Sequence, residues 1–181
     1  TFKLASGAIA LELGIVDPHE FMPVPCTGAY QFQNVVRRCW NPTGHGYLDL
    51  AGAIANSCNV YFYQLGLRIG LERLVQEASG LGFGERCGVD LPFESRGVFP
   101  ESLVYWQEQF GYLPYENEVM AMSIGQGPND QTPLKMAQFY MALARDGTDP
   151  APRLRRLGEG EEVEAEWSLD LSEENLAALM E

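Results

Sequence analysis

Hydrophobic residues recur at helical spacing in several separate stretches of the chain. Residues 1–13 show this spacing, and Gly14 follows them as a helix stop. The pattern resumes near Leu48 and again over residues 61–69, and a further helix is expected over about 71–79, where glycines follow. These stretches predict a mainly helical molecule.

The strongest helix signals lie in the second half of the chain. Thr132 is suited to cap a helix and Pro133 to occupy its first position, so we predict a helix from there to Gly147. Ser172 is expected to cap a last helix. The apolar stripe of the helix after Thr132 is predicted to consist of Leu134, Ala137, Met141 and Ala144.

Segments rich in glycine, proline and short polar residues separate these helices. Residues 15–47 are expected to be rich in loops, residues 85–118 to be irregular, and residues 152–169 to form strand and turn. Short polar side chains bond to their own backbone and disfavour helix interiors. We therefore expect residues 56–59 to lie at a junction between two helices.

Composition and charge narrow the class of protein. The 181 residues are 46% hydrophobic and 20% charged, which is typical of one globular domain. Acidic residues outnumber basic ones 25 to 12, so the basic surface that binds nucleic acid or anionic membranes is not expected. No run of about 18 apolar residues predicts a membrane helix. The chain lacks an initial Met and ends inside a predicted helix, so we expect both ends to be cut from a longer protein.

Three short segments carry candidate chemistry: a lysine at position 3, Ser57-Cys58-Asn59 and Gly125-Gln126-Gly127. Taken singly, each has an ordinary structural explanation as an exposed side chain, a cap or a turn. Together they suit acyl transfer. A serine nucleophile needs a base, and a partly desolvated lysine can serve as one. A second serine can relay the proton, and an asparagine amide can hold the substrate.

The order of these segments along the chain resembles the transpeptidase domain of class B penicillin-binding proteins, most closely its elongation-type members. The resemblance covers nearly all of residues 1–181. It is carried by Thr1-Phe2-Lys3, Cys39-Trp40, Gly44-His45-Gly46, Ser57-Cys58-Asn59, Gly82-Phe83-Gly84, Gly88-Val89-Asp90-Leu91-Pro92, Ser123-Ile124-Gly125-Gln126-Gly127 and Thr132-Pro133-Leu134.

The resemblance implies an α/β fold of the penicillin-binding and serine β-lactamase type. In this chain the helical subdomain would dominate, against an incomplete antiparallel sheet, so that residues 1–181 form a partial domain. The implied function is a D,D-transpeptidase that cross-links peptidoglycan through an acyl-serine on D-Ala-D-Ala stem peptides. β-Lactams would acylate the same serine, and no cofactor is required for catalysis.

Residue roles follow from the resemblance by position. Lys3 matches the general base, Ser57 the proton-relaying serine and Asn59 the substrate-binding asparagine. Gln126 lies in the segment that borders the cleft, where structural support and substrate contact are both open.

Two parts of the family pattern lie outside the chain. The nucleophilic serine would immediately precede Thr1, and the Lys-Thr-Gly strand would follow Glu181. We therefore expect the chain by itself to form no acyl-enzyme. A β-lactam-sensing domain and a non-catalytic cell-wall scaffold are the alternatives. The resemblance also implies the periplasmic face of the bacterial inner membrane, an N-terminal anchor helix beyond this chain and elongation proteins as partners of the full-length protein.

The cysteines allow more than one chemistry. Cys26, Cys39 and Cys58 could supply thiolates to a structural zinc ion, with His45 as fourth ligand. A Cys26–Cys39 disulfide or free thiols, with His45 in a structural hydrogen bond, are the alternatives, since the implied compartment permits disulfides. Cys87 is expected to be a small buried residue.

Two further expectations concern the surface. His19 is expected to be exposed in a loop. An aromatic cluster could line a groove for a stem peptide or a partner protein, or pack as a cover over the core. It consists of Tyr105, Trp106, Phe110, Tyr112 and Tyr115.

Overall fold

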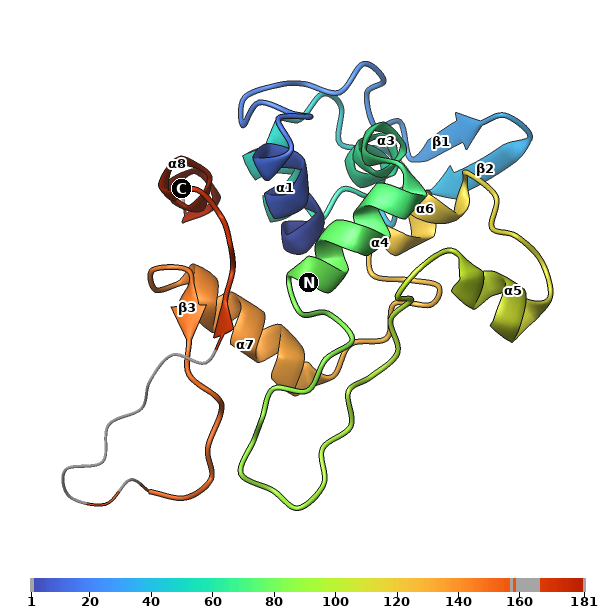
Figure 1. Cartoon of the computed structure of the whole chain (residues 1–181). Coiled ribbons are helices and arrows are strands. Elements are labelled where there is room, and N and C mark those ends of the chain that lie inside the picture. Colours follow the sequence, from blue (N-terminus) through green and yellow to red (C-terminus); the bar gives the residue numbers. More distant parts are fainter. Residues whose placement is uncertain (1, 157, 159–166, 181) are drawn as a thin grey trace.

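The computed structural model describes residues 2–156, 158 and 167–180 and shows helices gathered around a central one, α1 (Figure 1). The helices are α1 (Phe2–Glu12), α2 (Leu50–Ala55), α3 (Asn59–Ile69), α4 (Leu71–Gly80), α5 (Val104–Phe110), α6 (Glu118–Met122), α7 (Pro133–Leu143) and α8 (Glu173–Met180). The strands are β1 (Ala29–Phe32), β2 (Val35–Arg38), β3 (Thr148–Asp149) and β4 (Trp167–Ser168).

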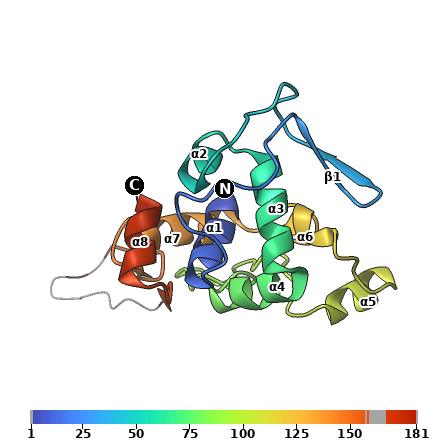
Figure 2. The ribbon, with the colours of Figure 1, turned by 90° about the horizontal axis from the view of Figure 1, so that it is seen from above.

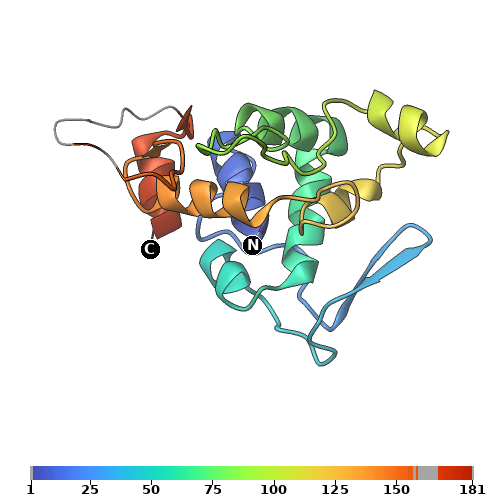
Figure 3. The ribbon, with the colours of Figure 1, turned by 90° about the horizontal axis from the view of Figure 1, so that it is seen from below.

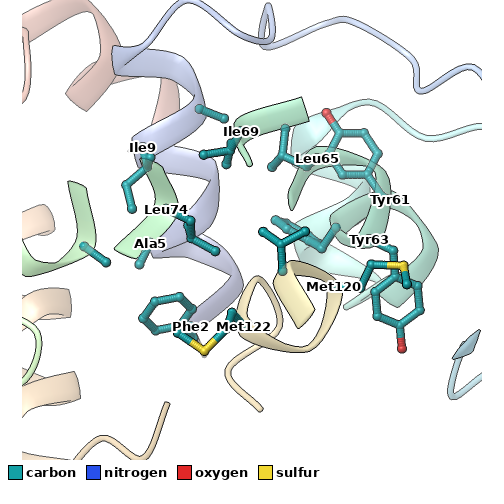
Figure 4. Packing of buried hydrophobic residues seen from close by; sticks show 14 of the residues in the cluster. Phe2, Ala5, Ile9, Tyr61, Tyr63, Leu65, Ile69, Leu74, Met120 and Met122 are labelled. Atoms are coloured by element: carbon teal, nitrogen blue, oxygen red, sulfur yellow. The ribbon is translucent and has the colours of Figure 1, made fainter. Parts of the chain in front are cut away.

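Helix α1 is buried along almost its whole length. It contacts α3, α4 and α8, and apolar side chains from α1, α3, α4 and α6 meet in the core (Figure 4). Gly14 adopts a left-handed conformation (φ 62°) just beyond its end. The predicted helix over residues 1–13 is therefore confirmed.

The predicted junction between two helices is present at residues 56–58. Asp49 caps α2 by accepting a hydrogen bond from the backbone N–H of Gly52 (2.8 Å), and α3 begins at Asn59. Ser57 between them has φ 49°, a left-handed conformation that is uncommon for a residue other than glycine. The chain thus makes a tight turn at this serine.

Two small antiparallel sheets are present in the described part of the chain. β1 pairs with β2 and β3 with β4. The β1–β2 hairpin projects from the helical body (Figures 2 and 3) and lies within the loop-rich residues 15–47, where no strand was predicted. Its four-residue strands are too short for a clear alternating pattern. In the predicted strand-and-turn segment, residues 157 and 159–166 lie outside the described residues.

Helix α5 contradicts the prediction that residues 85–118 are irregular. Only Trp106 of this seven-residue helix is buried, so no apolar stripe reveals it in the sequence. Gly111 ends α5 in a left-handed conformation (φ 78°). The short α6 begins at Glu118, at the edge of the same segment.

The start of α7 is confirmed, but its buried face differs from the predicted stripe. Thr132 Oγ1 accepts a hydrogen bond from Lys135 N (3.1 Å), and the helix ends at Leu143 rather than Gly147. Met141 of the predicted stripe is 54% exposed. The buried residues are Lys135, Gln138, Phe139, Ala142 and Leu143.

Two polar residues lie on the buried face of α7 and pair with each other. Lys135 Nζ donates to Gln138 Oε1 (2.9 Å), so these two buried side chains satisfy each other. Phe139 packs against Phe83 with ring centroids 5.4 Å apart.

Helix α8 lies beside α1 (Figure 2) and begins as predicted. Ser172 Oγ accepts a hydrogen bond from Asn175 N (3.3 Å). Glu12 Oε2 accepts hydrogen bonds from Ser172 N (3.0 Å) and Asn175 Nδ2 (2.7 Å), which ties α8 to the end of α1. Within the described residues, no helix combines the length and apolar character needed to cross a bilayer.

Candidate active site

Lys3 on the first turn of α1 contacts both candidate residues of the helix junction. Its Nζ donates to Ser57 Oγ (2.8 Å), to the Ser57 carbonyl (2.7 Å) and to Asn59 Oδ1 (2.7 Å). Lys3 is only 9% exposed. The structure therefore joins three residues predicted from segments more than 50 positions apart in the sequence.

The junction turn directs these side chains toward α1. Asn59 is the first residue of α3, and its Nδ2 donates to the Arg38 carbonyl (3.4 Å). Tyr63, one turn further along α3, donates to the same carbonyl through its hydroxyl (3.1 Å). The end of β2 thus braces the α3 side of the site.

Burial lowers the pKa of Lys3 below its ordinary value of 10.5, whereas the negative charge that Cys39 and Cys58 carry as thiolates acts in the opposite direction. Because desolvation is the largest influence, Lys3 loses its proton at a lower pH than an exposed lysine does. A neutral amine next to a hydroxyl can accept a proton. The site therefore favours the neutral form of Lys3 more than solvent does.

The Gly125-Gln126-Gly127 loop lies against the start of α1. Gly125 has φ 79°, and a Cβ there would come within 2.8 Å of the Cβ of Phe2. Only glycine permits this approach without a shift of the neighbouring backbone. Gln126 is exposed. Gly125 therefore supports the residue next to Lys3, whereas substrate contact by Gln126 stays a prediction.

A cluster of thiols and one imidazole lies on the other side of the junction turn. One ligand atom each from Cys26, Cys39, His45 and Cys58 lies within 4.8 Å of the others. His45 Nδ1 is 3.5 Å from Cys26 Sγ and 3.7 Å from Cys39 Sγ. All four cysteines of the chain are free thiols, so the Cys26–Cys39 disulfide is not formed in this structure.

The residues of this thiol cluster fit a zinc ion. Three sulfurs and one imidazole are a common donor set of structural zinc sites. Zinc bonds of about 2.3 Å to sulfur and about 2.1 Å to nitrogen, at tetrahedral angles, would separate sulfur from nitrogen by about 3.6 Å. The two sulfur–nitrogen distances match that value. Burial raises the pKa of Cys58 to about 12, so a metal cation would have to displace its proton.

Comparison with known proteins places this arrangement in a family. A sequence profile described as the penicillin-binding protein transpeptidase domain matches residues 1–168. The chain belongs to the penicillin-binding protein transpeptidase family. The resemblance carried by the short motifs is thereby confirmed.

Curated relatives share the chain's sequence over most of its length. The peptidoglycan D,D-transpeptidase MrdA of Acinetobacter baumannii is 36% identical over 124 residues, which make up 68% of this chain and 18% of the relative. MrdA of Escherichia coli K12 is 29% identical over 153 residues, 83% of this chain and 23% of the relative. The chain thus spans about a fifth of the length of these relatives.

Solved structures confirm the fold class of the transpeptidase domain. Penicillin-binding protein 2 (PBP2) of Pseudomonas aeruginosa superimposes with a TM-score of 0.85 at 30% identity, covering 99% of this chain and 40% of that one. PBP2 of Helicobacter pylori superimposes with a TM-score of 0.83 at 28% identity, covering 98% and 32%. The chain therefore holds part of the α/β penicillin-binding fold, as predicted.

Two buried serines of the transpeptidase domain, Ser6 and Ser123, have a structural role that was not predicted from the sequence. Ser6 Oγ donates to the Ser123 carbonyl (2.8 Å), and Ser123 Oγ donates to the Phe62 carbonyl (2.8 Å). This chain of bonds links α1, the end of α6 and α3 beneath Lys3. A single serine in apolar surroundings carries no periodic signal. The only hints that these two link the helices were that Ser6 follows Lys3 by about one helical turn and that Ser123 stands two residues before Gly125.

The remaining sequence predictions have mixed outcomes in the transpeptidase domain. Cys87 is buried and His19 is exposed, as expected. In the aromatic cluster, Trp106 is fully buried, as expected of a cover packed over the core. Tyr115 is 69% exposed, so the expectation of a packed cover is wrong for this residue. Phe110 and Tyr112 are exposed as well, with their rings stacked 6.0 Å apart.

Proposed function

We propose that the protein containing this chain is a peptidoglycan D,D-transpeptidase that uses an acyl-serine mechanism. The observation that carries the proposal is the contact of Lys3 Nζ with Ser57 Oγ and Asn59 Oδ1. Curated relatives bear the name peptidoglycan D,D-transpeptidase, which supports the same assignment.

In the first half of the reaction, a serine immediately before Thr1 attacks the carbonyl carbon between the two D-alanines of a stem peptide. The neutral Lys3 amine accepts the hydroxyl proton as the serine oxygen bonds to carbon. Ser57 then relays a proton to the departing D-alanine amine, and the carbon–nitrogen bond breaks. The product is an acyl-serine and free D-alanine.

In the second half, an amine of a neighbouring stem attacks the acyl-serine. The amine gives up a proton to Lys3 through Ser57 as the new amide forms. The bond between the acyl carbon and the serine oxygen breaks, the serine oxygen takes that proton from Lys3, and the two stems are cross-linked. Asn59 is assigned to hold the donor peptide through its side-chain amide. A β-lactam enters the same route and stops at the acyl-serine, because its ring-opened amine stays attached to the acyl group.

The setting of the reaction is part of the proposal. We assign the protein to the periplasmic face of the inner membrane, anchored outside this chain, with elongation proteins as partners. A solved complex of H. pylori PBP2 with MreC supports a partner of that kind. The chain by itself is proposed to be inactive, because the nucleophile and the Lys-Thr-Gly strand lie outside it.

Labelling with a fluorescent penicillin tests the proposal in a protein extended at both ends. Lys3→Ala removes the base, and Ser57→Ala removes the relay, so we expect each to slow acylation by about 100-fold or more. Ser102→Ala, in an exposed turn before α5, is the matched control and should label at the unchanged rate. Full-rate labelling of folded Lys3→Ala would contradict the mechanism. Sustained turnover of a stem peptide would exclude a sensor that reacts once.

We also propose that the thiol cluster holds a structural zinc ion through Cys26, Cys39, His45 and Cys58. The sulfur–nitrogen distances support it. The ion would fix the Cys58 end of the junction turn and take no part in acyl transfer. Elemental analysis of protein purified without added metal should find one zinc per chain. A Cys26–Cys39 disulfide detected by mass spectrometry, with no bound metal, would contradict this assignment.

A further inference from the structure

The turn that carries Ser57 has to be held in an unfavourable conformation. Ser57 has φ 49°, where its Cβ crowds the backbone. The turn follows the C-terminal end of α2, and the carbonyls of Asn56 and Ser57 lie in it, beyond the last residue of that helix. Groups that bond to these carbonyls therefore fix the position of the Ser57 hydroxyl.

Trp40 supplies such a bond. Its indole Nε1–H donates to the carbonyls of both Asn56 and Ser57, each at 3.1 Å. The Ser57 carbonyl thus accepts from Trp40 on one side and from Lys3 Nζ, at 2.7 Å, on the other. Hydrogen bonds from Trp40 and Lys3 thus fix the peptide group between Ser57 and Cys58.

Burial does not explain the tryptophan at position 40. Its side chain is 63% exposed, so it contributes little to the hydrophobic core. It directly follows Cys39, and its ring centroid lies 5.3 Å from that of His45. The indole is therefore held by the loop of the thiol cluster and directed by it toward the turn.

We propose that Trp40 is a positioning residue for acyl transfer, whose indole N–H holds the Ser57 turn so that Ser57 Oγ stays within reach of Lys3 Nζ. The inference rests on the proposed transpeptidase function. It assigns to Trp40 an action through the Ser57 backbone, in place of contact with the substrate.

A kinetic experiment on the longer, active protein tests this inference. Trp40→Phe removes the N–H, and 3-benzothienylalanine at position 40 removes it while keeping the bicyclic shape. β-Lactam acylation is followed over a range of concentrations to separate the dissociation constant of the initial complex from the acylation rate constant. Loss of one hydrogen bond predicts an acylation rate constant about tenfold lower and an unchanged dissociation constant.

Two controls make the result specific. 7-Azatryptophan at position 40 keeps the N–H and should restore the rate. Trp167→Phe is the same substitution at an indole that packs near Lys135, away from the site, and should leave both constants unchanged.

The outcomes separate the inference from the proposed function. An unchanged acylation rate constant without the N–H would overturn the role of Trp40 and leave the transpeptidase assignment standing. A change confined to the dissociation constant would overturn it too, because it would make Trp40 a ligand contact. Failure of the unsubstituted protein to acylate would overturn both.

Discussion

Two opposing influences act on the pKa of Lys3. Burial disfavours the ammonium form and lowers the pKa of Lys3, whereas the thiolate forms of Cys39 and Cys58 would raise it. The three acceptors around Nζ match the three N–H donors of an ammonium group. When Lys3 loses a proton, the Ser57 carbonyl still has the Trp40 N–H as a donor. The buried amine can therefore become neutral without leaving that carbonyl unpaired.

At single residues, the structure brings together those that the sequence motifs had grouped. Lys3, Ser57 and Asn59 were predicted from their order along the chain, and the structure brings them into contact. Lys135 stands outside the apolar stripe predicted for its helix, and nothing in the sequence indicates that it is buried. Its bond to Gln138 requires knowledge of the packed helix.

At the scale of elements, the loop between α6 and α7 depends on glycine at position 125. We predict that Gly125→Ala lowers the free energy of unfolding by about 3 kcal/mol, since the left-handed backbone and the crowded contact with Phe2 both oppose a Cβ. The shift of Phe2 should also slow penicillin labelling, because Lys3 is its neighbour. Chemical denaturation and labelling of the longer protein measure the two effects.

Gly111→Ala is the matched control for this substitution. Gly111 has nearly the same φ, 78°, but a Cβ there meets nothing within 4 Å. Gly111→Ala should lower the free energy of unfolding by only about 1 kcal/mol, through backbone strain, and leave penicillin labelling unchanged. Equal effects of the two substitutions would contradict the supporting role assigned to Gly125.

Helices could be predicted where the apolar pattern was long enough or where a capping residue was present. α1, α3, α4 and the starts of α7 and α8 followed from apolar spacing and from the caps at Thr132 and Ser172. The β1–β2 hairpin and α5 did not, because the first has four-residue strands and the second buries only one side chain. The buried face of α7 was not predictable either, because it includes the polar pair Lys135 and Gln138, which an apolar pattern does not show.

At the scale of the whole molecule, the thiol cluster brings together four segments of the chain, some of which are also joined by backbone hydrogen bonds such as Cys26 N to Gly46 O and Cys39 N to Gly28 O. Its residues come from the loop before β1, the end of β2, the following loop and the start of α3. A bound ion would close these segments together beside the active site. The four cysteine positions were visible in the sequence, but their spacing matched no common zinc motif, so only the fold could show which of them meet.

Metal removal is therefore predicted to weaken the molecule as a whole. Stripping the longer protein with a chelator should lower its melting temperature by several degrees, because the folded state loses the stabilisation that a bound ion supplies. Cys26→Ala should show the same lowered value with no further response to chelator. Cys87→Ala, which removes a buried thiol outside the cluster, should keep the response. An unchanged melting temperature after treatment with the chelator would contradict the zinc assignment.

The pH dependence of acylation tests the central claim, that Lys3 acts as the base, most directly. Its proton must leave first, so the acylation rate of the longer protein should rise with pH and level off at the lowered pKa of Lys3, below 10.5. Lys3→Arg keeps the charge and the donors but stays protonated, and should acylate at least about 100-fold more slowly with no such rise. A Lys3→Arg protein with the same rate and pH profile as the unsubstituted one would contradict the account.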